Sequence, residues 1–172
     1  SIADSVALAI TTPVGVVLHT GDFKIDYTPI DSIPMDFERI AEIGKKGVLL
    51  LMSDSTNVQR PGHTMSERSV GREFDKIFTN CNKRIIVATF ASNIHRMQQI
   101  INSAVKFNRK VAVVGRSMLN VIQVAGELGY LNAPEGTLID IDKIGIYNPE
   151  QLVIITTGSQ GEPMSALSRM AM

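Results

Sequence analysis

The stretch Leu152–Pro163 holds residue types that suit the binding of an anion. An apolar, largely β-branched run leads into Thr156-Thr157-Gly158-Ser159-Gln160-Gly161, and a helical pattern follows. Glycines remove Cβ atoms where a ligand could approach, and free N–H groups at a helix start attract negative charge. The pattern predicts either a loop that contacts phosphate or an ordinary turn between a strand and a helix.

Small and hydroxyl-bearing residues recur where two other apolar strands give way to helices. The three segments are Thr89–Asn93, Gly115–Ser117 and Thr156–Ser159. In a parallel sheet the carboxyl ends of the strands lie along one edge, where ligands of open α/β folds bind. His95, Arg96 and Arg116 are near these ends. Three such ends with arginines nearby favour an anion site, although serines at these positions also serve as helix N-caps.

Two aspartates, Asp22 and Asp54, each follow an apolar strand. A carboxylate in that position can bind a metal, act as a base or orient a histidine, but aspartate is also a common turn residue. His19 lies shortly before Asp22, and the sequence contains no His-x-His, no His-x-x-x-His and no pair of cysteines. Because a catalytic zinc needs about three protein ligands, the residue pattern by itself predicts no metal site within this chain.

Several enzyme motifs are excluded by spacing. Gly158-Ser159-Gln160-Gly161 has neither the glycine spacing of a dinucleotide fingerprint nor the lysine of a Walker loop, and no Gly-x-Ser-x-Gly is present. Ser159 has no base beside it in sequence, and Cys81 lies between two asparagines without an activating partner. Neither residue is favoured as a catalytic nucleophile.

The composition is typical of a soluble globular protein. The 172 residues are 44% hydrophobic and 20% charged, and Lys plus Arg equals Asp plus Glu at 17 each. Without net basic charge, an anion site must come from local arrangement. The single cysteine excludes an internal disulfide and fits a reducing cytosol, and no apolar run approaches the roughly 20 residues of a membrane span. The start at Ser1 and the stop within a helical run, Ser165–Met172, predict a fragment of a longer protein.

The first part of the chain predicts a hairpin, a helix and a buried strand. The hairpin strands are 6–12 and 16–20, the helix is near 36–45 with Phe37, Ile40, Ala41 and Ile43 facing inward, and the next strand is 48–52. Because residues 48–52 are apolar on both faces, we expect this strand in the centre of its sheet. Thr64 with Glu67 forms a capping box for a helix that runs to about Phe78.

From residue 84 onward, strands and helices alternate. The predicted strands are 84–90, 110–114, 137–141 and 151–156, with helices at 93–107 and 117–128 and a turn or brief helix at 142–145. The apolar strands lack a period of two, which is typical of a parallel sheet with helices on both faces. The predicted fold class is therefore α/β.

Five segments, in order, carry a resemblance to a known family. They are Thr20–Lys24, Ser53–Asn57, Phe90–Arg96, Val114–Met118 and Thr156–Arg169. Together they resemble the ribonuclease J family, part of the β-CASP group of the metallo-β-lactamase superfamily. The opening Ser1–Ser5 looks like the segment that, in the family, directly follows a metal-ligating histidine. The resemblance implies part of a metallo-β-lactamase αββα sandwich over residues 1–62, followed by most of a β-CASP domain over residues 63–172.

The implied activity is zinc-dependent hydrolysis of RNA phosphodiesters, by exonuclease action, endonuclease action or both, in RNA processing and decay. Asp22 matches the aspartate of the family's fourth motif, which bridges two zinc ions. Asp54 matches the acidic residue of β-CASP motif A, which is expected to hold an active-site histidine. The resemblance thus implies catalytic roles for Asp22 and Asp54, and a role as metal ligand for Asp22.

The same resemblance implies residues that face RNA phosphates. They are Ser92, Asn93, His95, Arg96, Arg116, Ser117, Thr157, Gly158, Ser159, Gln160 and Gly161. The family's other metal-ligating histidines and the two β-CASP histidines are not found in this chain. We therefore expect the chain alone to bind no catalytic zinc and to cut no RNA, while a cytoplasmic, homo-oligomeric parent protein does.

Two other functions remain open at this point. A stand-alone doubly wound module could bind a phosphorylated small molecule at the same sheet edge. Alternatively, the serines could be helix caps only, in a chain with a structural or assembly role. Tight, salt-insensitive binding of a small phosphate would favour the module, whereas weak, salt-sensitive binding of an oligonucleotide would favour RNA.

Overall fold

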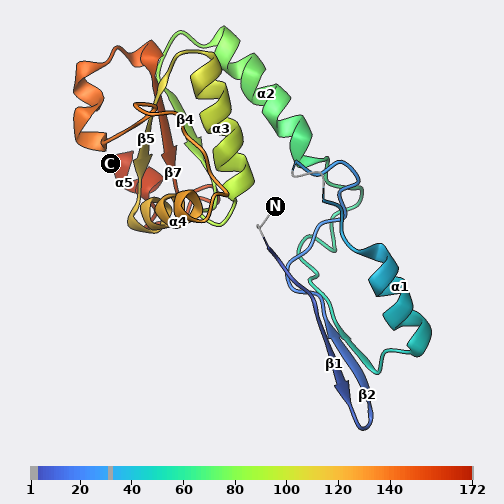
Figure 1. Ribbon diagram of the computed structural model, residues 1–172. Coiled ribbons are helices and arrows are strands. Elements are labelled where there is room, and N and C mark those ends of the chain that lie inside the picture. Colours follow the sequence, from blue (N-terminus) through green and yellow to red (C-terminus); the bar gives the residue numbers. More distant parts are fainter. Residues whose placement is uncertain (1–3, 31–32, 172) are drawn as a thin grey trace. The chain divides into compact units, whose positions relative to one another are not determined.

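The computed structural model describes residues 4–30 and 33–171, which Figure 1 shows as helices and strands. The chain forms two compact units, Asp4–Arg68 and Ser69–Met172. Most of the opening segment and Met172, the last residue of the predicted helical run, lie outside the described residues. The division into domains 1–62 and 63–172 stays a prediction.

The first unit contains a small mixed sheet. β1 (Leu8–Thr12) and β2 (Gly15–His19) pair antiparallel, which confirms the predicted hairpin. α1 (Phe37–Lys46) then leads to β3 (Leu50–Met52), which pairs parallel with β2. Parallel neighbours cannot be joined by a tight turn, so a crossover such as α1 is required between them.

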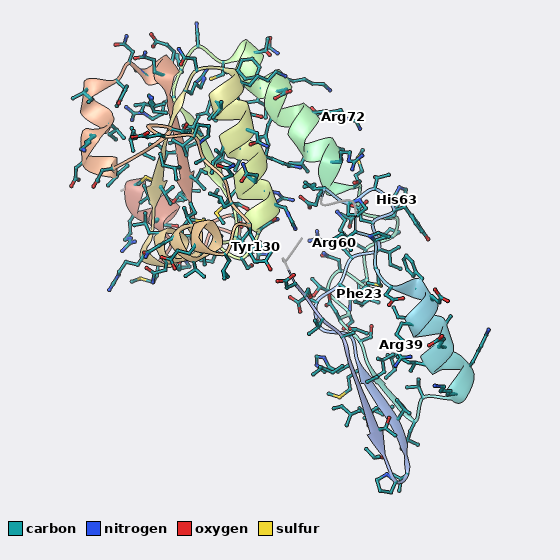
Figure 2. The ribbon with its side chains drawn as sticks, viewed as in Figure 1. Phe23, Arg39, Arg60, His63, Arg72 and Tyr130 are labelled. Atoms are coloured by element: carbon teal, nitrogen blue, oxygen red, sulfur yellow. The ribbon has the colours of Figure 1, made fainter. Side chains whose placement is uncertain are left out.

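α1 begins where the sequence predicts it, because Asp36 caps it. The Arg39 N–H donates to Asp36 Oδ1 at 2.9 Å. The Arg39 side chain projects from the helix (Figure 2) and pairs with Glu42 at 2.9 Å. The apolar stripe is only partly covered, since Phe37 and Ile40 are 38% and 39% exposed. The expected burial of this stripe is therefore wrong for the described residues.

β3 departs from the predicted position. The strand order is β1-β2-β3, so β3 lies at one end of the sheet that the described residues form, and the prediction of a central strand is wrong. Leu50 and Leu51 point to opposite faces and are 51% and 57% exposed. Among residues 4–30 and 33–68, Leu18 is the one buried side chain. An apolar pattern on both faces is typical of a strand that is covered on both sides, and it does not determine the order of strands.

The second unit is built on a parallel sheet. Its strands are β4 (Ile85–Ala88), β5 (Lys110–Val114), β6 (Leu138–Ile139) and β7 (Leu152–Thr156). They lie in the order β4-β7-β5-β6 and all are parallel, which confirms the sequence prediction. β7 lies between β4 and β5 and is buried along its whole length.

Helices cover this sheet. They are α2 (Glu67–Asn80), α3 (Ile94–Lys106), α4 (Arg116–Glu127), the 3-10 helices η1 (Ile141–Ile146) and η2 (Pro149–Gln151), and α5 (Ala166–Met170). Side chains of α2, α3 and α4 form the main core with Val111 and Val153 on one face of the sheet. Ala112 and Ile154 point to the other face and are also buried, and η1 contacts β5. None of the described helices combines the length and the hydrophobicity that crossing a bilayer requires.

The start of α2 differs from the prediction. A capping box at Thr64 would place Glu67 third in the helix, whereas Glu67 is the first helical residue. The Glu67 N–H donates to Asp26 Oδ2 at 3.1 Å, and Lys24 forms an ion pair with Glu67 at 3.6 Å. The carboxylate at this helix start therefore comes from a loop distant in sequence, which the local pattern could not indicate.

Candidate functional site

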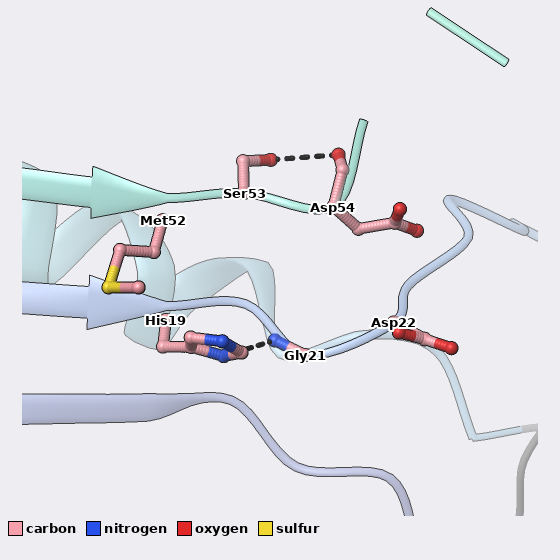
Figure 3. Close-up of a pocket in the computed structure, with 6 residues that line it drawn as sticks. All are labelled: His19, Gly21, Asp22, Met52, Ser53 and Asp54. Atoms are coloured by element: carbon pink, nitrogen blue, oxygen red, sulfur yellow. Dashed lines mark hydrogen bonds between the residues drawn. The ribbon is translucent and has the colours of Figure 1, made fainter. Parts of the chain in front are cut away.

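The ends of β2 and β3 form an open cleft in the first unit (Figure 3). Its volume is about 290 Å³, and its lining residues are His19, Gly21, Asp22, Met52, Ser53 and Asp54. The two strands are parallel neighbours, and His19 lies opposite Met52 in the ladder. The loops that follow them therefore begin side by side. This pairing brings together Asp22 and Asp54, which are far apart in sequence, and both carboxylates extend beyond the strand ends.

The Asp54 side chain is fixed by Thr56. Asp54 Oδ1 accepts the Thr56 N–H at 2.9 Å and the Thr56 hydroxyl at 2.7 Å. These bonds stabilise the carboxylate and lower the pKa of Asp54, the Thr56 N–H having the largest effect and the Phe23 and Ser55 N–H groups adding to it. Phe23 follows Asp22 in the loop after β2 (Figure 2). Asp54 is therefore ionised at neutral pH.

Asp22 is an exposed carboxylate in the same cleft. Its backbone oxygen accepts a hydrogen bond from the Ser5 hydroxyl at 3.3 Å, and His19 Nδ1 accepts the Gly21 N–H at 3.0 Å. A catalytic zinc takes three protein ligands. The described part of the chain contains no group of three His, Cys, Asp or Glu side chains that could hold a metal ion. By themselves, these residues do not fit a zinc site.

The second unit brings three strand ends to one edge of its sheet. Ala88 of β4 and Val114 of β5 both pair with Thr156 of β7. The pairing continues for one residue, because the Thr89 N–H donates to the Thr156 oxygen at 2.9 Å. The segments after these strands therefore begin side by side, and the prediction that the strand ends share one edge is confirmed.

Most of the second unit matches a known protein family. A family model described as "Ribonuclease J, beta-CASP domain" matches residues 82–172. The match begins just before β4 and covers more than half of the chain. The chain belongs to the ribonuclease J family.

Curated relatives extend the likeness to nearly the whole chain. A protein named Ribonuclease J from Helicobacter pylori is 51% identical over 171 residues, which is 99% of this chain and 25% of that protein. Another of the same name, from Synechocystis, is 52% identical over 171 residues, which is 99% of this chain and 27% of that protein. The chain thus spans about a quarter of the length of these ribonuclease J proteins.

A solved structure shares the fold at low sequence identity. It is a protein of unknown function from Enterococcus faecalis, with a TM-score of 0.56 and 19% identity, and the match covers 90% of this chain and 38% of that one. At this identity the likeness concerns the fold alone.

The first of the three segments predicted to face phosphate lies at the start of α3. Asn93 is buried, and its side chain accepts the Arg96 N–H at 3.1 Å as the N-cap. Ser92 is exposed, while His95 and Arg96 are half-buried. The N-cap of α3 is therefore Asn93 and not the serine that the sequence offered for this role, and contact of this segment with phosphate stays a prediction.

The second segment lies at the start of α4 and is different. Gly115 occupies the N-cap position and no side chain caps the helix, and Arg116 and Ser117 are exposed. A helix start without a side-chain cap keeps N–H groups directed at whatever approaches it. Of the two long helices at this edge, α4 is thus the better suited to an anion.

The sequence predicts a helix start at the third segment, Thr157–Gly161, but no helix begins there. α5 begins only at Ala166, whose N–H donates to Thr157 Oγ1 at 3.3 Å, and the Leu167 N–H donates to the Thr157 oxygen at 3.1 Å. These N–H groups of α5 are therefore engaged within the chain. Residues 159–161 are exposed in a turn that the Gly161 N–H closes onto the Gly158 oxygen at 3.0 Å.

Two threonines that contact Asp54 were not predicted as site residues from the sequence. Thr56 binds the Asp54 carboxylate, and the Thr20 hydroxyl accepts the Asp54 N–H at 3.0 Å. Thr56 follows Asp54 at the spacing of an Asx turn, so local pattern could have indicated it. Thr20 could not be found in this way, because its contact with Asp54 depends on the pairing of β2 with β3.

Replacing Thr56 by Val should raise the pKa of Asp54 part of the way toward its ordinary value. The substitution removes the hydroxyl that donates to Oδ1 but keeps the Thr56 N–H, which has the larger effect. An NMR titration of the Asp54 side-chain carboxyl carbon measures the change.

Ser53→Ala is the matched control, because the Ser53 hydroxyl donates to the Asp54 backbone oxygen and not to its carboxylate. The pKa of Asp54 should stay in place in this variant. An equal rise in both variants would show that the Thr56 hydroxyl has no specific effect.

Proposed function

We propose that the full-length protein containing this chain is a ribonuclease that hydrolyses RNA phosphodiester bonds in RNA processing and decay. The observation that carries the proposal is the 51% identity to a protein named Ribonuclease J over 99% of the chain. This identity extends over both the Asp22–Asp54 cleft and the strand-end edge. The proposal covers exonuclease action, endonuclease action or both.

Asp22 is proposed as one ligand of a two-zinc centre whose other ligands lie outside these 172 residues. The observation that supports this is the place of Asp22, an exposed carboxylate in the cleft. Zinc held in such a site would supply a bound water of lowered pKa and would stabilise negative charge on the phosphate. Asp54, which is ionised and fixed by Thr56, would orient a histidine from elsewhere in the protein.

The strand-end edge of the second unit is proposed to hold the RNA backbone. The uncapped start of α4 and the exposed Arg116 beside it support this role. Arginine and helix N-termini both bind phosphate without reading bases, so this contact would position RNA rather than select its sequence. A formal net charge of zero is compatible, since the positive groups are local.

The proposed parent acts in the cytoplasm as a homo-oligomer, and this chain alone is inactive. The single cysteine supports a reducing compartment. Inactivity follows from the metal centre, because one aspartate cannot hold two zinc ions.

The test is an RNA cleavage assay with the full-length protein and with the 172-residue chain, each with added zinc. The full-length protein should cleave a 5′-monophosphorylated RNA and lose this activity to a chelator. A full-length protein without activity would contradict the proposed function, and cleavage by the short chain would contradict its proposed inactivity.

A second candidate function is a module that binds a phosphorylated small molecule, and the uncapped α4 start favours it. Calorimetry of the full-length protein with a mononucleotide, a sugar phosphate and a 5′-monophosphorylated oligonucleotide separates the two functions. Tight binding of a small phosphate that salt does not weaken would favour the module. Binding of the oligonucleotide that weakens steeply with salt would favour RNA.

A further inference from the structure

Thr20 joins the ends of the two strands that carry Asp22 and Asp54. It follows β2 directly, and its N–H donates to the Met52 oxygen of β3 at 3.0 Å. Its hydroxyl accepts the Asp54 N–H at 3.0 Å and donates to the Gly21 oxygen at 2.8 Å. One half-buried residue therefore continues the pairing of β2 with β3 after the regular ladder has ended at His19 and Met52.

Both hydroxyl contacts act on the peptide groups that orient the aspartates. The Asp54 N–H is part of the Asp54 backbone itself. The Gly21 oxygen belongs to the same planar peptide unit as the Asp22 nitrogen, so a bond to that oxygen limits the rotation of the plane from which Asp22 extends. Gly21 has a φ of +60°, and a built Cβ would lie 2.9 Å from the Val6 oxygen, so a residue with a side chain would be strained and crowded at this point.

We propose that Thr20 is a positioning residue for the reaction, because its single hydroxyl fixes the Asp22 and Asp54 loops relative to each other. The inference rests on the proposed ribonuclease function. Thr20 need not touch RNA or metal; it acts through the backbone of the two aspartates. A hydroxyl is required because the position must accept one hydrogen bond and donate another.

Three variants of the full-length protein separate positioning from general stability. Thr20→Val keeps the β-branched shape but can neither donate nor accept, and it leaves the Asp54 N–H and the Gly21 oxygen without this partner. Thr20→Ser keeps both contacts. Thr12→Val is the matched control: the Thr12 hydroxyl donates to the Gly15 oxygen at 2.7 Å and accepts the Val14 N–H at 3.3 Å, at the opposite end of β2.

The experiment measures kcat and KM for RNA cleavage and the hydrogen exchange of the Asp54 amide. Thr20→Val should lower kcat about tenfold to a hundredfold, the usual effect of losing a residue that orients a ligand, and should speed Asp54 exchange. KM should change by less than about twofold, because the contact with RNA is kept. Thr20→Ser and Thr12→Val should leave kcat and Asp54 exchange close to the wild-type values.

Wild-type kcat in Thr20→Val, or an equal fall in Thr12→Val, would overturn the positioning role. The exchange measurement keeps this test separate from the proposed function. If the wild-type protein does not cleave RNA, the ribonuclease proposal fails together with the catalytic part of this inference. Unchanged exchange of Asp54 in Thr20→Val would overturn the structural part, whatever the activity.

Discussion

Replacing Asp22 by Asn in the full-length protein should lower the rate of RNA cleavage by more than about a hundredfold. Loss of a residue that only hydrogen-bonds to a metal ligand lowers activity by about tenfold to a hundredfold, and loss of a ligand itself should have a larger effect. Asparagine keeps the size and the position of the side chain but lacks the charge that a zinc ligand supplies. The zinc content should fall with the activity, and elemental analysis of the purified variant measures it.

Asp142→Asn is the control for this substitution. Asp142 is an exposed aspartate in η1, so its replacement by Asn removes the same charge at a position outside the cleft. Its activity and zinc content should equal those of the wild type. If Asp22→Asn retained both its zinc and its activity, Asp22 would not be a metal ligand.

The parallel sheet of the second unit could be predicted because its signals are local. Each strand is a short apolar run, and helices that start and stop within a few residues of the predicted bounds separate β4 from β5 and β5 from β6. The common edge of β4, β5 and β7 then follows from parallel strands alone. The order β4-β7-β5-β6 was not predicted, because no local pattern records which strands are neighbours.

The errors at β3 and at the start of α2 share one physical cause, which is dependence on distant residues. β3 has the pattern of a strand covered on both faces, yet Leu50 and Leu51 are half exposed among the described residues. The chain spans about a quarter of the length of its ribonuclease J relatives, so a pattern adapted to a longer protein need not match the contacts within 172 residues. Likewise, the first N–H of α2 donates to Asp26 instead of being capped by Thr64.

The candidate site could be predicted only in part, because it also depends on contacts between residues that are distant in sequence. Asp22 and Asp54 stand out because each follows an apolar strand. Their common cleft depends on the parallel pairing of β2 with β3, which the sequence does not show. Thr20 is the clearest omission, since its hydroxyl contacts Asp54 only once this pairing exists.

Gly158 is the position in the loop 157–161 where a substitution should have the largest effect on stability. Its φ is +116°, and a built Cβ would lie 2.5 Å from Ser165 Oγ and 2.8 Å from Leu167 Cβ. Gly158→Ala should therefore combine backbone strain with overpacking, at a cost of about 3 kcal/mol. Hydrogen exchange of the β7 amides in the full-length protein measures this change in local stability.

Gly161→Ala separates the two contributions within the same loop. Gly161 also has a positive φ, +72°, but no atom lies within 4 Å of its built Cβ. Only backbone strain remains, so this variant should cost about 1 kcal/mol. The difference between the two variants measures the packing of the loop against Ser165 and Leu167 together with the greater backbone strain at a φ of +116°. Equal losses in both variants would mean that this packing contributes nothing, and that the loop is held by its turn alone.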